Sequence, residues 1–189
     1  MVKIISDSTC DLSEELLKAY DIDIIPLQIL LGEDSYEDGR GITSEGIFEW
    51  SDAHKACPKT AAVNMERTMG ILEPYITEGR EVVVFTISSH ISATYQVVGM
   101  AAESLGGQHL VHVVDSLNLA TGVGIQVLAA ADLAREGKTA AEIVEVIKGL
   151  IPRVRTSFVV DTRGIKPLMT STISAAVLPS RARSAAANT

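Results

Sequence analysis

Apolar runs and amphipathic segments follow one another along this chain in an order that predicts parallel strands joined by helices. Short, mostly apolar runs occupy residues 2–5, 82–85 and 110–114. Such runs are typical of strands buried on both faces of a sheet. Each precedes a segment with apolar residues at helical spacing. The pattern therefore predicts βα units that build a mostly parallel sheet within a three-layer α/β/α domain.

Capping residues and glycines mark the ends of the predicted helices. Ser13 or Asp11 is expected to cap the first helix and Thr139 the last, because short polar side chains accept hydrogen bonds from first-turn amides. Gly106 and Gly137 are expected to follow the ends of two others. The first helix starts within residues 11–17, and the others span residues 43–55, 64–77, 92–105, 119–135 and 139–150.

The remaining segments are less regular. Residues 21–31 are expected to be rich in strand with a break at Pro26, residues 33–41 to form an acidic turn, and residues 57–63 to form a loop. A last strand is expected at residues 156–160. The candidates for burial in the helix at 43–55 are Ile47, Phe48 and Trp50.

Composition narrows the classes of function. The chain has 189 residues, of which 47% are hydrophobic and 4% aromatic, so its core must consist of aliphatic side chains. A net charge of −8 argues against binding to nucleic acid. No apolar run approaches membrane-spanning length, and no signal peptide precedes the first strand. Cys10, Cys57 and the histidines show no metal-ligand spacing. We expect a cytoplasmic protein without metal or cofactor.

Polar side chains follow three predicted strands. Asp7 and Ser8 follow the first strand, Ser89 the second, and Asp115 ends the third. Open α/β sheets bind ligands at the carboxyl ends of their strands, so we expect a polar ligand head at this edge. Ser89 is predicted to lie just before a helix, where its hydroxyl and free amides can receive a carboxylate or phosphate. A simple N-cap role fits Ser89 equally well.

Catalytic interpretations of this edge are weaker. Cys10 could be a thiolate near a helix N-terminus, but a small buried hydrophobic residue is the favoured role. Ser89 and His90 are adjacent in sequence, which makes it hard to place the base on the hydroxyl, and no G-x-S-x-G motif is present.

Other polar and small residues here have structural explanations. Asp7 and Ser8 are expected to accept hydrogen bonds from loop amides. Gly122 and Gly124 resemble the start of a dinucleotide loop but lack its third glycine, so close helix packing is favoured.

Five segments of the chain form a recognisable combination. They are Ile-Ile-Ser-Asp-Ser-Thr-Cys-Asp-Leu at 4–12, the 22–26 segment, Pro-Lys-Thr at 58–60, Ile-Ser-Ser-His-Ile-Ser-Ala-Thr-Tyr-Gln at 87–96 and Val-Val-Asp-Ser at 113–116. In this order they resemble the DegV family of bacterial fatty-acid-binding proteins. The resemblance covers residues 1 to about 161.

The resemblance implies a cytoplasmic, non-catalytic carrier that holds a long-chain fatty acid in an apolar tunnel between two α/β domains. Some members present the acid to a fatty acid kinase. Carried onto this chain, the resemblance places the carboxylate at Ser89 and Thr60, with Ser8 close by. Two segments depart from the family pattern: Ala-Ala-Val-Asn at 61–64 replaces Ser-Gln-Pro-Ser, and Ala93 replaces a glycine.

Residues 162–189 differ from the rest of the chain. They contain no acidic and no aromatic residue and consist mainly of Ala, Ser, Thr and Arg. The resemblance implies a second α/β domain that continues here, and we expect this chain to lack it. We expect residues 1–161 to form a DegV-like N-terminal domain and residues 162–189 to be a disordered tail. A frameshift is an alternative origin of the tail, because codons allowed for residues 167–183 can encode a family-like segment in another frame.

Three functions stay open at this point. The favoured one is binding and presentation of a long-chain fatty acid. The first alternative is a small α/β hydrolase or transferase that uses Ser89 or Cys10. The second alternative is an inactive, truncated carrier.

Overall fold

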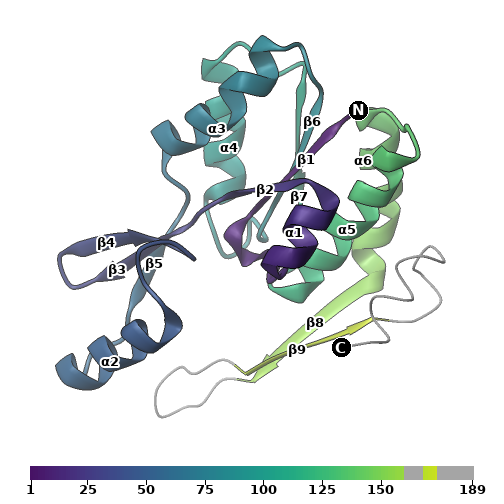
Figure 1. Ribbon diagram of the computed structural model, residues 1–189. Coiled ribbons are helices and arrows are strands. Elements are labelled where there is room, and N and C mark those ends of the chain that lie inside the picture. Colours follow the sequence, from purple (N-terminus) through teal and green to yellow (C-terminus); the bar gives the residue numbers. More distant parts are fainter. Residues whose placement is uncertain (160–167, 174–189) are drawn as a thin grey trace.

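A parallel sheet forms the centre of the computed structural model, which describes residues 1–159 and 168–173. Its four strands lie in the order β2-β1-β6-β7 (Figure 1). They are β1 (Lys3–Asp7), β2 (Ile22–Ile25), β6 (Val82–Thr86) and β7 (Val111–Asp115). All three neighbouring pairs are parallel, so the predicted parallel sheet is confirmed. The strands with polar carboxyl ends, β1, β6 and β7, are adjacent.

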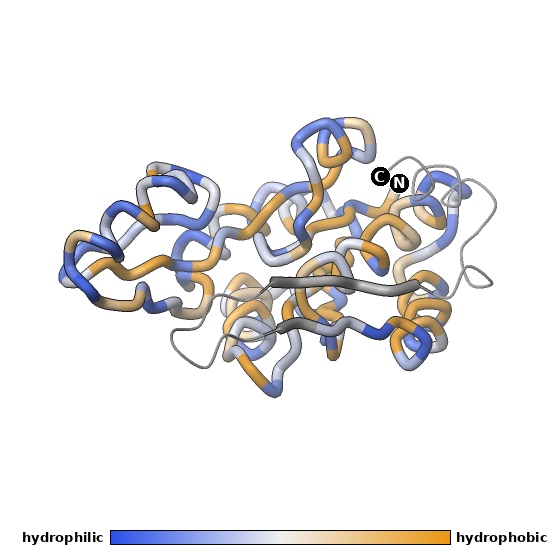
Figure 2. Tube along the Cα trace, turned by 90° about the horizontal axis from the view of Figure 1, so that it is seen from below, coloured by the Kyte–Doolittle hydropathy of each residue, from blue (hydrophilic) through white to orange (hydrophobic). Residues whose placement is uncertain are grey.

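Helices cover both faces of this sheet, which confirms the three-layer α/β/α architecture (Figure 1). One face carries α1 (Glu14–Tyr20), α5 (Thr121–Arg135) and α6 (Ala140–Leu150), and the other carries α3 (Met65–Thr77) and α4 (Thr94–Ser104). Successive residues of β1 serve the two cores in turn: Ile4 packs towards α5 and α6, and Ile5 towards α3 and α4. In Figure 2 hydrophobic stretches (orange) run through the middle of the trace, and hydrophilic stretches (blue) lie mainly at its outer turns.

The predicted helix ends agree with the observed caps. Ser13 is the N-cap of α1, and its hydroxyl accepts a hydrogen bond from Leu16 N at 3.3 Å. Thr139 forms a capping box with Glu142 at the start of α6. Gly106 follows α4 with a φ of +68°, a conformation that glycine adopts without steric cost. The described residues contain no helix long and apolar enough to cross a membrane.

Close packing accounts for the two glycines of α5, as predicted. A Cβ on Gly122 would lie 2.1 Å from Thr156 Oγ1, and one on Gly124 would lie 2.4 Å from the backbone oxygen of Cys10. The Cys10 oxygen belongs to the short 3-10 helix η1 (Ser8–Cys10), directly after β1. Gly124 therefore allows α5 to approach the loop that carries Ser8.

Replacing Gly124 by alanine is expected to lower the free energy of unfolding by about 1–3 kcal/mol, because the added methyl group meets backbone that cannot rotate away. Gly70 is the matched control, since its Cβ would meet nothing within 4 Å on the surface of α3. Gly70→Ala should raise stability by about 0.5–1 kcal/mol through helix propensity. Urea denaturation of both variants tests this, and equal effects would refute the close approach.

A small antiparallel sheet extends from the main domain beyond β2 (Figure 1). It has the order β4-β3-β5, with β3 (Gln28–Leu31) between β4 (Asp34–Glu37) and β5 (Lys59–Ala61). The predictions of a turn at 33–41 and a loop at 57–63 were wrong for these two strands. Both are short and polar, and all of β5 is exposed. Both strands form because they pair with β3 and not because they bury apolar side chains, so their sequences show no apolar alternation.

The helix α2 (Ser44–His54) accompanies this small sheet. The prediction that its apolar residues are buried was wrong, since no residue of α2 is buried and Phe48 is 56% exposed. Ile47 and Trp50 are half-buried. A three-stranded sheet with short outer strands offers too little surface to cover a helix face.

The last predicted strand exists but does not join the parallel sheet. After the short helix η2 (Ile151–Arg153), β8 (Val154–Val159) pairs antiparallel with β9 (Leu168–Ile173). β9 falls within the predicted tail, where the sequence showed no strand periodicity. The rest of that tail, residues 162–167 and 174–189, lies outside the described residues, so the prediction of disorder is untested there.

A buried lysine fixes the start of the parallel sheet. Lys3 is 3% exposed, and its ammonium group lies 2.8 Å from Asp21 Oδ1 and 3.1 Å from Asp23 Oδ1. Tyr75 donates a 2.5 Å hydrogen bond to the other oxygen of Asp23. Burial alone would lower the pKa of Lys3, but the hydrogen bonds to both aspartates outweigh it and raise that pKa. This network pins the edge strand β2 to β1 and α3.

Candidate functional site

The loops after β1 and β6 are joined by one buried carboxylate. Asp7 Oδ2 accepts a 2.6 Å hydrogen bond from Ile87 N. Its Oδ1 accepts bonds from Thr9 N at 3.1 Å and from Thr9 Oγ1 at 2.6 Å. The prediction that Asp7 accepts hydrogen bonds from loop amides is confirmed. Asp7 thereby fixes the position of the segment that leads to Ser89.

A second carboxylate joins the loops after β6 and β7. Asp115 Oδ1 accepts hydrogen bonds from Ser89 N at 3.1 Å and from Leu117 N at 3.0 Å. The backbone of Ser89 is thus held beside Leu117. Its amide is used within the protein, which leaves the half-buried Ser89 hydroxyl as the group that can face a ligand.

The helix predicted at 92–105 exists as α4 (Thr94–Ser104), but the expectation that Ser89 lies just before it was wrong. The backbone oxygen of Ser88 accepts from Ile91 N at 3.1 Å and Ser92 N at 3.2 Å, so a turn comes first. α4 starts at Thr94, and its N-cap is Ala93, so Ser89 is not the N-cap. The hydrogen bonds that Ser88 O accepts in this turn leave no pattern in residue spacing, so the later start of α4 was not predictable from the sequence.

Ala93 gives the first turn of α4 no side-chain cap. Thr94 N donates to Ser92 Oγ at 3.2 Å, but no acceptor is recorded for Tyr95 N or Gln96 N within the described chain. These two amides stand at the carboxyl edge of the sheet, and uncapped first-turn amides favour anions. The signal was present in the sequence as an alanine at a position where Ser, Thr, Asp or Asn is preferred.

The structure brings Ser8 and Ser89 to the same edge and places Thr60 on the small sheet. Ser8 follows β1, and its hydroxyl accepts a 3.1 Å hydrogen bond from Leu27 N, at the start of β3. Thr60 is exposed in β5 and lies opposite Ile29 of β3. No hydrogen bond joins Thr60 to either serine in the part of the chain that the structure describes. The link between Ser8 and Thr60 therefore runs through β3.

Two exposed apolar side chains accompany this polar edge. Leu117 is 52% exposed and Ile91 is 62% exposed. Leu117 has a φ of +48°, which is unfavourable for a bulky side chain and is held here by the bond from its amide to Asp115. Neither residue was predictable as part of a site, because a single apolar residue in a polar loop has no periodicity. Together with Ser89 they suit an amphiphilic ligand.

The role of Asn118 was also not predicted from the sequence. It is buried, and its backbone oxygen accepts a 2.9 Å hydrogen bond from Ser88 N. Its side chain accepts from Thr156 Oγ1 at 2.8 Å and donates to Val154 O at 3.4 Å. Asn118 thus connects β8 to the serine-bearing turn. An isolated asparagine after a strand resembles an ordinary turn residue, so only its burial reveals this role.

The described residues around this edge do not assemble an activated nucleophile. Cys10 is 2% exposed within the aliphatic core, as predicted, and burial raises the pKa of its thiol. The exposed His90 binds Ser88 Oγ through its backbone amide at 3.3 Å. Within residues 1–159 and 168–173, no three His, Cys, Asp or Glu side chains form a metal-binding group. The polar side chains at this edge can hold a ligand by hydrogen bonds.

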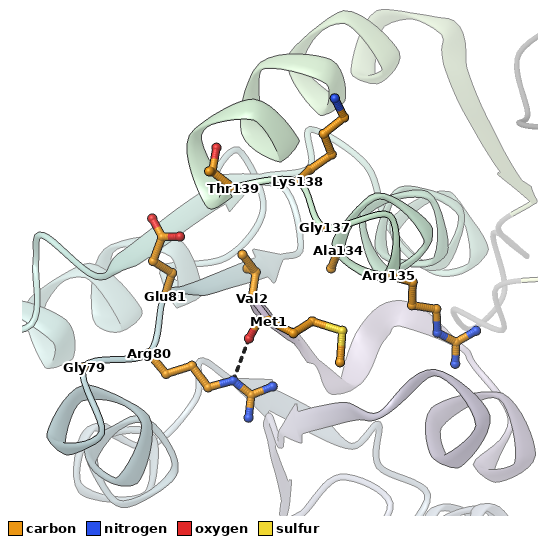
Figure 3. Close-up of a pocket in the computed structure, with 10 residues that line it drawn as sticks. All are labelled: Met1, Val2, Gly79, Arg80, Glu81, Ala134, Arg135, Gly137, Lys138 and Thr139. Atoms are coloured by element: carbon orange, nitrogen blue, oxygen red, sulfur yellow. Dashed lines mark hydrogen bonds between the residues drawn. The ribbon is translucent and has the colours of Figure 1, made fainter.

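A cavity of about 590 Å³ lies at the opposite, amino end of the sheet (Figure 3). In Figure 3 the guanidinium groups of Arg80 and Arg135 lie on either side of the Met1 side chain. Arg80 Nε donates to Met1 O at 2.9 Å, and the Arg135 guanidinium stacks 4.2 Å from the Tyr20 ring. These cations have structural partners, and the cavity includes none of the predicted site residues.

Comparison with known proteins matches this chain to one family. The family model described as "Uncharacterised protein, DegV family" matches residues 1–164 of the chain. A DegV domain-containing protein of Clostridium perfringens is 38% identical over 146 residues, covering 77% of this chain and 52% of the relative. A second, from Clostridium acetobutylicum, is 35% identical and covers 82% of this chain and 56% of the relative. The chain thus spans about half the length of these relatives.

Solved structures share the fold. A stearic-acid-binding protein from Eubacterium ventriosum is 28% identical with a TM-score of 0.78, and the match covers 85% of this chain and 57% of that protein. A DegV family protein from Thermus thermophilus, described by its fatty acid binding, is also 28% identical with a TM-score of 0.76 and the same coverage.

Proposed function

Because the chain belongs to the DegV family, we propose that it is a non-catalytic carrier that binds a long-chain fatty acid at the carboxyl edge of its parallel sheet. Ser89 and Thr60 hold the carboxylate, and Ser8 lies close by. The observation that carries this proposal is the combination found at one edge. The Ser89 hydroxyl and the first-turn amides of α4, which have no partner among the described residues, lie at the same edge as the exposed side chains of Ile91 and Leu117.

The groups at this edge meet the free-energy requirements for binding such a ligand. Burial of the acyl chain contributes about 0.8 kcal/mol per methylene. Removing a carboxylate from water is costly unless hydrogen-bond donors meet it. Ser89 and Thr60 offer hydroxyl donors, and Tyr95 N and Gln96 N offer amides at a helix end whose dipole favours negative charge. An amphiphile with a single anionic head therefore suits this edge better than a fully polar ligand.

The domain organisation and partners belong to the same proposal. Residues 1–161 form the N-terminal domain of a DegV-like carrier, and the family match over residues 1–164 supports that boundary. In the full carrier, a second α/β domain covers the apolar side chains and closes the tunnel. Presentation of the acid to a fatty acid kinase in the cytoplasm follows from the family resemblance.

Titration with stearic acid and with octadecanol tests the proposal, because the two ligands share a chain and differ in head group. We expect the acid to bind more tightly by about tenfold, the difference that a charge-assisted over a neutral hydrogen bond provides. Isothermal calorimetry in dilute detergent measures both affinities. Equal affinities, or no binding of either ligand, would contradict the proposal.

The alternative of a hydrolase or transferase that uses Cys10 makes an opposite prediction for thiol reactivity. We expect iodoacetamide to modify the exposed Cys57 rapidly and Cys10 only after unfolding, since Cys10 is buried and its pKa is raised. Mass spectrometry of the folded chain over time distinguishes the two sites. Rapid modification of Cys10 in the folded protein would favour the enzyme instead.

A further inference from the structure

The outer edge of β2 is unpaired in the described part of the chain. β2 pairs with β1 on one side and ends the sheet on the other. In a parallel ladder alternate residues direct both N–H and C=O to the same side, so half of the residues of β2 point these groups outward. Unpaired strand edges are templates for another extended chain.

A cavity of about 390 Å³ follows this edge. Three consecutive residues of β2, Ile22, Asp23 and Ile24, line it. Successive side chains of a strand point to opposite faces, so a cavity that touches all three must run along the edge of the strand. Leu17 of α1 and Ile71 of α3 supply apolar walls on the two sides.

The charge of this groove is positive. Arg40 and Arg67 both line it. Arg67 lies 3.2 Å from Glu37, whereas no ion pair is recorded for the exposed Arg40 among the described residues. The one acidic residue of the lining, Asp23, is already held by Lys3 and by Tyr75. An unmatched guanidinium therefore faces an otherwise compensated groove.

We propose that the groove formed by β2, α1 and α3 binds an extended peptide segment of a partner protein by strand addition, with an acidic side chain of that segment at Arg40. Backbone hydrogen bonds to β2 supply affinity, and the apolar walls and Arg40 supply specificity. At about 3.3 Å per residue, the four residues of β2 pair with a segment of similar length. This proposal does not depend on fatty acid binding.

A second copy of this chain fits the groove less well. The strand it would add through its own β2 carries Asp23 as its one acidic residue, and that carboxylate is engaged by Lys3. Arg40 would then gain no counter-charge from the added strand. The charge pattern therefore favours a different protein with a free carboxylate in an extended segment.

The probe for the test is a random peptide library displayed on phage and selected against the full chain. We expect enrichment of peptides that combine apolar residues with Asp or Glu. Their synthetic forms should bind Arg40→Glu about tenfold more weakly than the unmodified protein, the scale of one charge-pair contact. Arg153→Glu is the matched control, because it makes the same charge change at an exposed position of η2 outside the groove and should leave affinity unchanged.

Hydrogen exchange supplies the structural readout. Binding should slow exchange of the outward amides of β2, which have no strand partner within residues 1–159 and 168–173. The proposal is overturned if no peptide is enriched, if Arg40→Glu and Arg153→Glu bind alike, or if the amides of β2 stay unprotected. A concentration-dependent dimer in analytical ultracentrifugation, with slowed exchange in β2, would also overturn it in favour of a second copy.

Discussion

Asp7→Ala is expected to lower the free energy of unfolding by about 2–4 kcal/mol near neutral pH. The substitution leaves the amide of Ile87 without its acceptor and removes both bonds to Thr9. Buried donors without partners cost about 1–3 kcal/mol each, and bonds to a charged group contribute at the upper end of the range. Urea denaturation followed by circular dichroism measures the loss.

Asp52→Ala is the control, since Asp52 is exposed on α2 and the substitution should change stability by less than about 0.5 kcal/mol. Equal effects of the two substitutions would show that Asp7 does not tie the loops after β1 and β6. The hydrogen bond between Asp7 and Ile87 would then not explain the position of Ser89.

The effect of Asp7→Ala should also depend on pH. Burial raises the pKa of Asp7, while its hydrogen bonds from Thr9 and Ile87 act in the opposite direction. The folded protein therefore binds the Asp7 proton more tightly than the unfolded chain does. As pH falls through the folded pKa towards the ordinary value of 3.8, Asp7 contributes more stability. The difference between wild type and variant should grow as the pH falls from neutral towards 3.8, and a shrinking difference would contradict the raised pKa.

Ser89→Ala is expected to weaken binding of a long-chain fatty acid by about tenfold or more. A hydrogen bond to a charged group contributes about 1.5–3 kcal/mol, whereas one to a neutral hydroxyl contributes about 0.5–1.5 kcal/mol. Binding of the matching alcohol should therefore fall by only about threefold. Calorimetric titration of both ligands against both proteins provides the four affinities.

Ser104→Ala controls for the loss of an exposed hydroxyl, because Ser104 lies at the far end of α4. It should leave both affinities unchanged. If Ser89→Ala weakens acid and alcohol equally, Ser89 does not contact the head group. Thr60→Val extends the test to the small sheet, where the same preferential loss for the acid is expected.

The parallel core was predictable because burial itself leaves a pattern in the sequence. The runs at β1, β6 and β7 are mostly apolar because helices cover both faces of the sheet, and Ser13 and Thr139 cap helices by local hydrogen bonds. Such signals lie within a few neighbouring residues. They therefore survive without any knowledge of the tertiary contacts.

The small sheet and the details of the site were not predictable in the same way. β4 and β5 exist because they pair with β3, and their exposed polar residues carry no periodic signal. Asp115 and Asn118 connect loops that are distant in sequence. Asp115 Oδ1 accepts a hydrogen bond from Ser89 N, and Asn118 O accepts one from Ser88 N. The sequence indicated which edge of the sheet gathers the polar side chains, but not which of their donors lack a partner among the described residues.

Native mass spectrometry of the protein purified from a bacterial host, followed by organic extraction, shows whether the chain carries a fatty acid. We expect a mass increase that matches one long-chain fatty acid per chain, with the same acid recovered in the extract. It also predicts that Ser89→Ala carries less of this acid than Ser104→Ala. Retention of the same amount by both variants, or a lipid without a carboxylate, would contradict a fatty acid held at Ser89.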